Sequence, residues 1–211
     1  MSKNSQCLTT PEPSCEVRGF KIYKELLSKG QQITMIADLR RVVHQAPLFG
    51  PVMPSGRRMS VQMTSCGMLG WISDKAGYRY EKRHPSGVPW PPIPGSVLDI
   101  WRQVSTCRRI PDSCLINLYR EGARMGLHQD ADEADFRWPV VSVSLGDDGL
   151  FRIGNLQRGG TTESIWLQSG DVVVMGGNAR LVYHGIDRIR FGSSKLLSNG
   201  GRLNLTLRVA A

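Results

Sequence analysis

The C-terminal half of the chain contains side chains of the types that bind a transition metal. His128 and Asp130 are two residues apart, and residues i and i+2 of an extended segment point to the same side. His184 follows at the end of the apolar run 181–183. Two imidazoles and one carboxylate can bind non-haem Fe(II) on one face and leave the other coordination positions open. Each piece alone has an ordinary explanation, because His-x-Asp arises by chance and single histidines are usually structural or exposed.

Residues 202–208 alternate between polar and apolar side chains, as a strand with two different faces does. One face would carry Arg202, Asn204, Thr206 and Arg208, and the other Leu203, Leu205, Leu207 and Val209. A solvated outer strand explains this pattern. A face that lines a cavity explains it too, but two guanidinium groups there need anions. A dicarboxylate supplies two, and each charge-assisted contact contributes about 1.5–3 kcal/mol.

The two groups of residues explain each other if the chemistry is oxygenation driven by 2-oxoglutarate. An Fe(II) ion of this kind needs a chelating electron donor, and the two arginines need carboxylates. Asn117 and Tyr119 share a predicted strand face shortly before His128, so they can add hydrogen bonds to the same small acid. Ordinary strand polarity is the alternative for these two residues.

The elements expected to position these residues change in type near Pro111. Before it, the sequence predicts a flexible tail over 1–16, a strand over 20–23 and a helix over 31–45 that stops before Pro47. A hairpin over 59–71, a proline-rich loop over 84–95 and a helix over 97–104, with Ser96 as its N-cap, are predicted next. After it, short strands are predicted over 114–119, 140–145, 150–153, 164–168, 171–175, 181–184 and 202–209. Many short strands with glycine-rich turns favour a sandwich, barrel or jelly roll.

Composition limits the class of protein and its partners. The 211 residues fit one domain, and 27 Lys+Arg against 18 Asp+Glu give a formal charge of +9. A basic chain favours a polyanionic partner, nucleic acid above all, although many basic proteins bind none. Five cysteines without a CxxC pair argue against a disulfide framework or zinc site and indicate a reducing compartment. Neither a signal peptide nor a membrane span is predicted.

Several segments, taken in order, resemble the AlkB family of Fe(II)/2-oxoglutarate nucleic-acid dealkylases, and the bacterial members most. They are 114–133 (CLINLYREGARMGLHQDADE), 141–146 (VSVSLG), 170–177 (GDVVVMGG), 183–185 (YHG), 202–208 (RLNLTLR) and, in the lid region of the family, 59–71 (MSVQMTSCGMLGW). The likeness runs from about residue 18 to residue 209. Met175 is a departure, because the bacterial enzyme leads us to expect an aromatic residue there.

The resemblance implies a fold, and it implies cofactors. The fold would be α+β and mainly β: a double-stranded β-helix, or jelly-roll, core with flanking N-terminal helices and a β-hairpin nucleotide-recognition lid. A single domain would span 17–211, with the lid and the proline-rich loop at about 50–95. His128, Asp130 and His184 would bind Fe(II) and so be the catalytic residues. Arg202 would bind the distal carboxylate of the co-substrate 2-oxoglutarate and Arg208 its iron-chelating end. Asn117, Tyr119, Asn204 and Thr206 would complete that site.

The resemblance also implies a reaction. O2 and 2-oxoglutarate become succinate and CO2, the alkyl group on a base nitrogen is hydroxylated, and an aldehyde and the repaired base are released. Bases of the N1-methyladenine and N3-methylcytosine type in DNA are the expected substrate, with RNA as an open extension. Such lesions block pairing, which lowers the cost of extruding the base. Modified tRNA or a small molecule is the alternative substrate, and a non-catalytic module that binds damaged nucleic acid is the alternative class.

Contacts to the base follow from the same likeness. The substrate-binding residues would be Trp71, Tyr78, Tyr80, Asp132 and Arg158. Trp71 would stack on the extruded base, which is worth about 1–3 kcal/mol, unless it is a core residue of the lid. Asp132 would accept a hydrogen bond from an exocyclic amino group, and Arg57 and Arg58 would contact phosphates, although charges like these are often only solvated. The protein is expected to be cytoplasmic and monomeric, without a membrane or an obligate protein partner.

Overall fold

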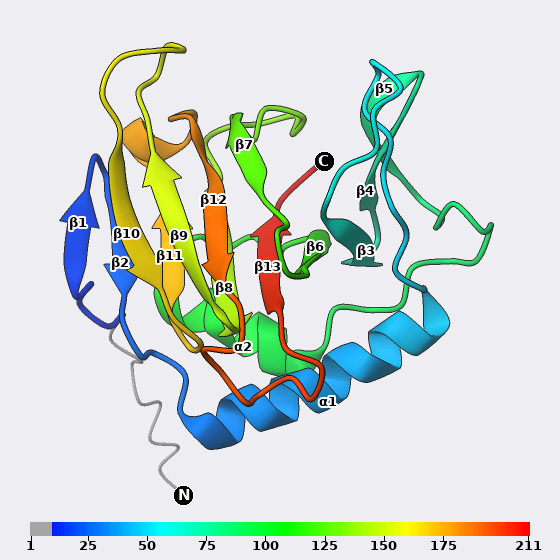
Figure 1. The fold of residues 1–211 in the computed structure, drawn as a ribbon, viewed down its shortest axis with the longest axis horizontal. Helices are drawn as coiled ribbons and strands as arrows, with labels where there is room; N and C mark the ends of the chain where they lie inside the picture. Colours follow the sequence, from blue (N-terminus) through cyan, green and yellow to red (C-terminus); the bar gives the residue numbers. More distant parts are fainter. Residues whose placement is uncertain (1–9) are drawn as a thin grey trace, which may run out of the picture.

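The computed structural model describes residues 10–211, and two antiparallel sheets form its core (Figure 1). The larger sheet has the order β1-β2-β11-β8-β13-β6-β3, from strands Cys15–Val17, Phe20–Tyr23, Val172–Met175, Val140–Gly146, Arg202–Arg208, Ser113–Tyr119 and Gln62–Gly67. The smaller has the order β10-β9-β12-β7, from Glu163–Leu167, Asp148–Ile153, His184–Arg190 and Met125–His128. This mainly β architecture is the predicted jelly-roll core.

Alternation along the central strands of the larger sheet separates an apolar face from a polar one. Leu203, Leu205 and Leu207 of β13 pack in the core beneath the sheet, while Arg202 and Arg208 line a cavity on its other face. Neighbouring strands follow the same rule. Their cavity-lining residues include Asn117 and Tyr119 of β6 and Ser142 of β8, and their core residues include Ile116, Leu118, Val141, Val143 and Leu145. The predicted two-faced strand is therefore confirmed, and its polar face looks inward.

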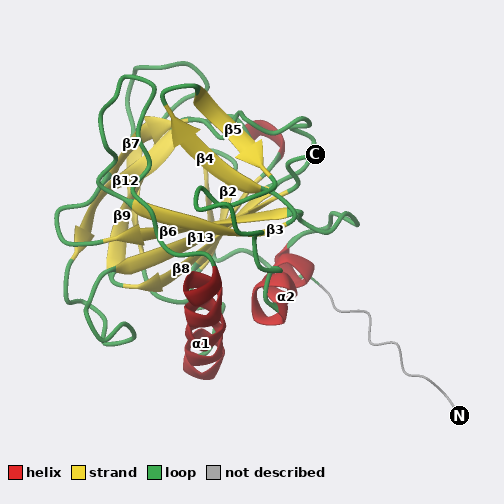
Figure 2. Cartoon of the chain, turned by 90° about the vertical axis from the view of Figure 1, so that its right-hand side faces the viewer, coloured by secondary structure: helices red, strands yellow, loops and turns green. Residues whose placement is uncertain are grey.

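Two helices cover the apolar face of the larger sheet (Figure 2). Helix α1 (Lys29–Gln45) begins with a capping box between Ser28 and Gln31 and ends at Ala46, before Pro47. Helix α2 (Gly95–Val104) presents apolar residues to the same core. Both predicted helices are confirmed, but Ser96 is not the N-cap of α2. Pro94 takes that position, and the Ser96 hydroxyl instead donates to Asp38 of α1 at 2.5 Å.

The predicted hairpin over 59–71 is wrong, because its two halves belong to different sheets. Strand β3 pairs with β6 in the larger sheet, whereas β4 (Gly70–Asp74) pairs with β5 (Gly77–Glu81) to form a separate hairpin. Gly67 marks the departure: its φ is +121°, and an added Cβ would lie 2.4 Å from the carbonyl oxygen of Asp112. The chain leaves the sheet there, and the β4–β5 hairpin stands to one side of the two sheets, next to β3 (Figure 1).

The remaining strand predictions hold with one further correction. Residues 181–184 were expected to be a strand, but β12 begins only at His184 and continues to Arg190. Apolar residues 181–183 instead follow a short 3-10 turn, η1 (Gly177–Ala179), and Val182 packs between the sheets. The first strand, β1, begins at Cys15, slightly before the expected end of the tail, and residues 1–9 of the tail lie outside the described part. In residues 10–211, neither helix has the length and hydropathy needed to span a bilayer.

Candidate metal centre and its cavity

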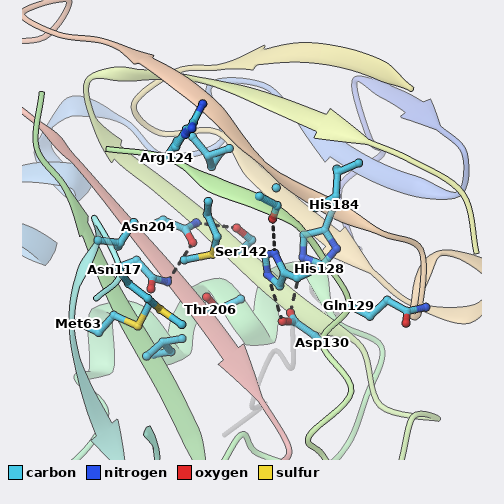
Figure 3. Close-up of a pocket in the computed structure, with 18 of the residues that line it drawn as sticks. Met63, Asn117, Arg124, His128, Gln129, Asp130, Ser142, His184, Asn204 and Thr206 are labelled. Atoms are coloured by element: carbon cyan, nitrogen blue, oxygen red, sulfur yellow. Dashed lines mark hydrogen bonds and ion pairs between the residues drawn. The ribbon is translucent and has the colours of Figure 1, made fainter. Parts of the chain in front are cut away.

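Strand pairing brings the three candidate metal ligands together in the lining of the cavity. His128 ends β7 and His184 begins β12, and these two residues are direct partners in the ladder. Asp130 follows two residues after His128. Its Oδ1 lies 3.8 Å from His128 Nε2 and its Oδ2 lies 3.8 Å from His184 Nε2. All three ligand atoms lie within 4.8 Å of one another, and the side chains converge on one point (Figure 3).

Backbone carbonyl groups fix both histidine rings with the same nitrogen turned inward. His128 Nδ1 lies 2.9 Å from the carbonyl oxygen of Gly126, and His184 Nδ1 lies 3.0 Å from that of Val182. A carbonyl oxygen only accepts, so each Nδ1 carries the proton and donates. Each Nε2 therefore presents a lone pair toward Asp130. This is the orientation that metal-binding histidines adopt.

The charges around the three residues suit a divalent cation. Burial, with His128 next to it, lowers the pKa of His184 to about 4, so this imidazole is neutral at pH 7. Burial opposes ionisation of Asp130, but the positive charge of Arg208 and its hydrogen bond outweigh burial and hold the pKa of that carboxyl well below its ordinary value. Asp130 Oδ2 is buried and has no hydrogen-bond partner in the described structure. Such an orphaned carboxylate oxygen between two imidazole lone pairs fits a bound metal ion.

The two arginines of β13 have different environments. Arg208 donates to Asp130 Oδ1 at 2.8 Å, and its Nε lies 3.3 Å from Glu133 Oε1. Arg202 is fully buried, and within residues 10–211 no carboxylate lies within ion-pair distance of it. It donates to Ser144 Oγ at 2.7 Å, and its Nε has no hydrogen-bond partner among the described residues. Burial lowers the pKa of Arg202 to about 10. A buried cation without a counterion is costly, so Arg202 fits one end of a dicarboxylate.

Neutral polar groups line the same wall between the arginines. Asn117 Nδ2 donates to Asn204 Oδ1 at 3.4 Å, while Asn204 Nδ2 donates to Ser142 Oγ at 2.7 Å. Asn117 Oδ1 is buried and has no hydrogen-bond partner in the part of the chain that the structure describes. The Tyr119 hydroxyl donates to Met125 Sδ at 3.7 Å, and burial raises its pKa, so it remains protonated. Thr206 is buried on the same strand face. The structure thus brings all the predicted 2-oxoglutarate residues onto one cavity wall.

The β4–β5 hairpin contributes the aromatic residues Trp71 and Tyr78 to the lining of the cavity. Trp71 and Tyr78 are stacked, with ring centroids 5.5 Å apart and planes at 17°. Trp71 Nε1 donates to Asp132 Oδ2 at 2.7 Å, so this carboxylate is engaged by the hairpin. Tyr80, the third predicted aromatic contact, does not line the cavity; its hydroxyl donates to Glu133 Oε1 at 2.5 Å.

Basic residues stand around the rim of the cavity, whose volume is about 1050 Å³. Arg57 and Arg58 come from the segment before β3, and Arg158 comes from the loop between β9 and β10. All three are exposed, and Arg158 lies 5.1 Å from the ring centroid of Tyr183. Met175 is buried and also lines the cavity. Apart from Tyr80, the predicted substrate and phosphate contacts therefore line the same cavity as the metal ligands.

Comparison with known proteins identifies the family. The family model described as 2OG-Fe(II) oxygenase superfamily matches residues 19–208. An alpha-ketoglutarate-dependent dioxygenase AlkB homolog of Caulobacter vibrioides is 50% identical over 200 residues, covering 94% of this chain and 91% of the relative. This chain belongs to the AlkB family. It is an Fe(II)/2-oxoglutarate-dependent dioxygenase whose cofactors are Fe(II), 2-oxoglutarate and O2.

Further relatives agree with this assignment. AlkB of Escherichia coli is 43% identical over 181 residues, covering 83% of each chain. The solved structure of OsALKBH1 has a TM-score of 0.75 and 28% identity, covering 92% of this chain and 99% of that one. The predicted family, jelly-roll core and enzyme class are confirmed.

Sequence reasoning missed two buried residues of this AlkB-family protein. Glu133 and Arg180 form an ion pair at 2.8 Å directly behind Asp130, with side chains only 2% and 3% exposed. Glu133 stood in the segment that matches the family, but nothing in its spacing set it apart from the neighbouring acidic residues. Arg180 lies 47 positions away, in a turn that no periodicity marks. Only the folded chain shows that the two meet.

Proposed function

We propose that this AlkB-family dioxygenase removes methyl groups from base nitrogens in DNA, with N1-methyladenine and N3-methylcytosine as its type of substrate. The single observation that carries this proposal is one cavity in which a His-Asp-His cluster and an unpaired buried arginine face an aromatic hairpin. AlkB relatives at 43–50% identity support the same chemistry.

The residues take the following roles in this proposal. His128, Asp130 and His184 hold Fe(II) through the two Nε2 atoms and a carboxylate oxygen. Bound there with 2-oxoglutarate and O2, Fe(II) would supply the oxidising power for hydroxylation of the methyl carbon, and the hydroxylated product would break down to formaldehyde and the repaired base. Arg202 binds the distal carboxylate of 2-oxoglutarate, because it is the buried arginine of β13 that has no carboxylate partner among residues 10–211. Arg208 lies at the metal end, and Asn117, Tyr119, Asn204 and Thr206 complete the pocket.

The lesion type follows from charge and hydrogen bonding. Methylation of N1 in adenine or N3 in cytosine makes the base cationic and leaves an exocyclic amino group beside the methyl group. Asp132 lines the cavity, so it can attract the cation and accept from the amino group. The Trp71–Tyr78 pair supplies a stacking surface for an extruded base. A lesion that cannot pair costs less to extrude, which favours damaged bases over normal ones.

The proposal extends to partners and location. Nucleic acid is the macromolecular partner, held through phosphates by Arg57, Arg58 and Arg158 on the rim. The chain acts as a monomer in this proposal. A cytoplasmic location agrees with the four cysteines of the described region, Cys15, Cys66, Cys107 and Cys114, all of which are free thiols.

Formaldehyde release tests the substrate. Purified protein with Fe(II) and 2-oxoglutarate is given single-stranded DNA, duplex DNA and tRNA, each carrying N1-methyladenine, and formaldehyde and the repaired base are measured. We expect turnover on methylated DNA and at least 100-fold less from Asp130→Ala, because a metal ligand is lost. Asp135→Ala is the matched control, since Asp135 does not line the cavity. Turnover on tRNA alone would shift the substrate to RNA, and inactivity on all three would contradict the proposal.

A further inference from the structure

Glu133 is a buried carboxylate that contacts three different parts of the fold. Arg180 Nη2 donates to its Oε2 at 2.8 Å, and the Tyr80 hydroxyl donates to its Oε1 at 2.5 Å. Arg208 Nε lies 3.3 Å from the same Oε1. A buried carboxylate is retained only where such partners compensate its desolvation. Glu133 therefore joins the turn after η1, the hairpin strand β5 and the cavity strand β13.

Arg180 carries this network to the main chain of the candidate metal ligand. Its Nη1 donates to the carbonyl oxygen of Asp130 at 2.6 Å, and its Nε donates to the carbonyl oxygen of Trp138 at 3.0 Å. One guanidinium thus holds the backbone at 130 and the side chain at 133. The direction in which the Asp130 carboxylate points depends on that backbone segment. Arg180 touches neither the cavity nor the three ligand atoms.

Tyr80 is the link to the hairpin. Strand β5 carries Tyr78 and Tyr80 on one face, but only Tyr78 lines the cavity. Burial raises the pKa of the Tyr80 hydroxyl, so it stays a donor to Glu133. Movement of the hairpin away from the core would break this bond and leave a buried Glu133 oxygen with fewer partners.

We propose that Arg180 and Glu133 are positioning residues that couple the β4–β5 hairpin to the iron ligand Asp130, with the Tyr80 hydroxyl as the connecting bond. Metal binding and hairpin closure then favour each other. An ordered Glu133–Arg180 pair fixes the Asp130 backbone for metal binding, and the same pair offers Tyr80 its acceptor. This inference rests on the proposed role of His128, Asp130 and His184 as metal ligands.

Thermodynamic linkage makes the coupling measurable from both ends. If a closed hairpin strengthens metal binding, bound metal must stabilise the closed hairpin by the same factor. At the metal site, the measurement is the dissociation constant of Mn(II), obtained by electron paramagnetic resonance without O2 and with 2-oxoglutarate present. At the other end, it is amide hydrogen exchange of the segment Gly70–Glu81, with and without Mn(II) and 2-oxoglutarate. Neither measurement depends on turnover.

The variants form a double-mutant cycle. Tyr80→Phe should weaken Mn(II) binding about three- to tenfold, and Arg180→Gln about tenfold or more, as contacts behind metal ligands do. The double variant should show less than the product of the two losses, because both act through Glu133. Glu133→Gln keeps an oxygen for Tyr80 and replaces Arg180→Gln if that protein does not fold. In wild type, Mn(II) with 2-oxoglutarate should slow exchange in the hairpin, and Tyr80→Phe should abolish that slowing.

Tyr23→Phe is the matched control, because it removes a hydroxyl from a buried tyrosine that neither lines the cavity nor donates to Glu133. It should leave both the Mn(II) dissociation constant and the ligand-dependent exchange of the hairpin unchanged. Wild-type protein that binds no Mn(II) would overturn the metal assignment, and the coupling with it. Wild-type protein that binds Mn(II), together with variants of equal affinity or a hairpin that does not respond to the ligands, would overturn the coupling alone.

Discussion

At the scale of single residues, the two buried arginines of β13 differ in what compensates their charge. Arg208 is held by two carboxylates of the protein, Asp130 and Glu133, whereas the buried Arg202 has only neutral acceptors within residues 10–211. A guanidinium with neutral acceptors alone is stabilised much less than one in an ion pair. The free protein therefore keeps Arg202 at a cost, and an incoming carboxylate removes that cost.

This difference predicts that replacement by Met affects the stability of the fold much less at position 202 than at position 208. Arg202→Met should change the free energy of unfolding of the metal-free protein by less than about 1 kcal/mol, because the lost hydrogen bonds are offset by relief of a buried charge. It should weaken 2-oxoglutarate binding about 10- to 150-fold, the equivalent of one charge-assisted contact. Arg208→Met should destabilise the fold by about 3–5 kcal/mol, because Asp130 and Glu133 lose their partner. Urea unfolding of the metal-free proteins measures the free energy of unfolding. Titration calorimetry with Mn(II) present measures the affinity for 2-oxoglutarate.

A strongly destabilised Arg202→Met protein, or one with unchanged affinity for 2-oxoglutarate, would contradict the inference that the Arg202 guanidinium binds a carboxylate of 2-oxoglutarate.

The buried imidazole of His184 predicts a pH dependence of stability. Its pKa is about 4 in the folded chain against 6.5 as the ordinary value. Between these two pH values the unfolded chain binds more protons, so stability falls as the pH is lowered from 6.5 to 4. The loss attributable to this one group is about 3 kcal/mol at full effect. Urea titrations of metal-free protein at both ends of the window measure it.

His184→Gln cannot take up the proton, so most of this pH dependence should disappear in that variant. An equally steep dependence in wild type and variant would assign the effect to other groups.

At the scale of elements, the turn between β1 and β2 organises a loop of the cavity. Arg18, at a φ of +49°, donates to Glu163 Oε1 at 2.8 Å and to the carbonyl oxygen of Gly154 at 2.7 Å. It also donates to Asn155 Oδ1 at 2.5 Å and to the carbonyl oxygen of Thr161 at 3.1 Å. These contacts close the loop between β9 and β10, which carries Arg158 to the rim.

We therefore expect Arg18→Ala to loosen that loop without disturbing the metal site. Amide exchange of residues 154–162 should accelerate, and KM for a methylated oligonucleotide should rise about three- to tenfold, since the rim arginine is less ordered. The affinity for 2-oxoglutarate should stay the same. Arg41→Ala is the control, because among residues 10–211 its only ion pair is with Asp38 of the same helix. A loss of 2-oxoglutarate binding in Arg18→Ala would mean that the turn supports the whole site.

Local sequence patterns predicted the elements that local physics decides. The helix over 31–45 follows from apolar spacing and Pro47, and the inward polar face of β13 follows from strict alternation. Pairings between distant strands were not visible in this way. The hairpin expected over 59–71 failed because β3 finds its partner in β6, about 50 positions later, rather than in the next segment. Likewise, β12 was missed over residues 185–190, whose charged side chains obscure the apolar pattern of a strand.

The same limit applies to the site. The types of His128, Asp130 and His184 suggested a metal, but their convergence depends on the register between β7 and β12, which pairs His184 with His128. The Glu133–Arg180 pair could not be predicted from the local sequence, because the two residues come into contact only in the folded core. Residue types therefore indicated the chemistry, and tertiary pairing supplied the geometry.

At the scale of the whole molecule, the formal charge is +9, and the basic residues differ in whether a carboxylate is paired with them. Many arginines are paired with carboxylates, such as Arg102 with Asp99 and Arg137 with Asp135. Among residues 10–211, Arg57 and Arg58 form no ion pair and lie exposed at the cavity rim. Unpaired cations beside a cavity are the ones that displace counterions from a nucleic acid, whereas paired cations contribute little.

Salt dependence of binding separates these two kinds of charge. For a methylated single-stranded oligonucleotide, the slope of log K against log salt should fall in magnitude by about 1.4 when Arg57 and Arg58 are both replaced by Ala, because each phosphate contact on a single strand contributes about 0.7. The double variant Arg102→Ala with Arg137→Ala removes the same net charge from paired positions outside the cavity, so its slope should match wild type. Fluorescence anisotropy over a series of salt concentrations measures both slopes. The preference for methylated over unmethylated oligonucleotide should survive in both variants, since phosphate contacts position the strand and do not identify the base. Equal losses of slope in the two double variants would mean that net charge, and not these two rim arginines, governs binding.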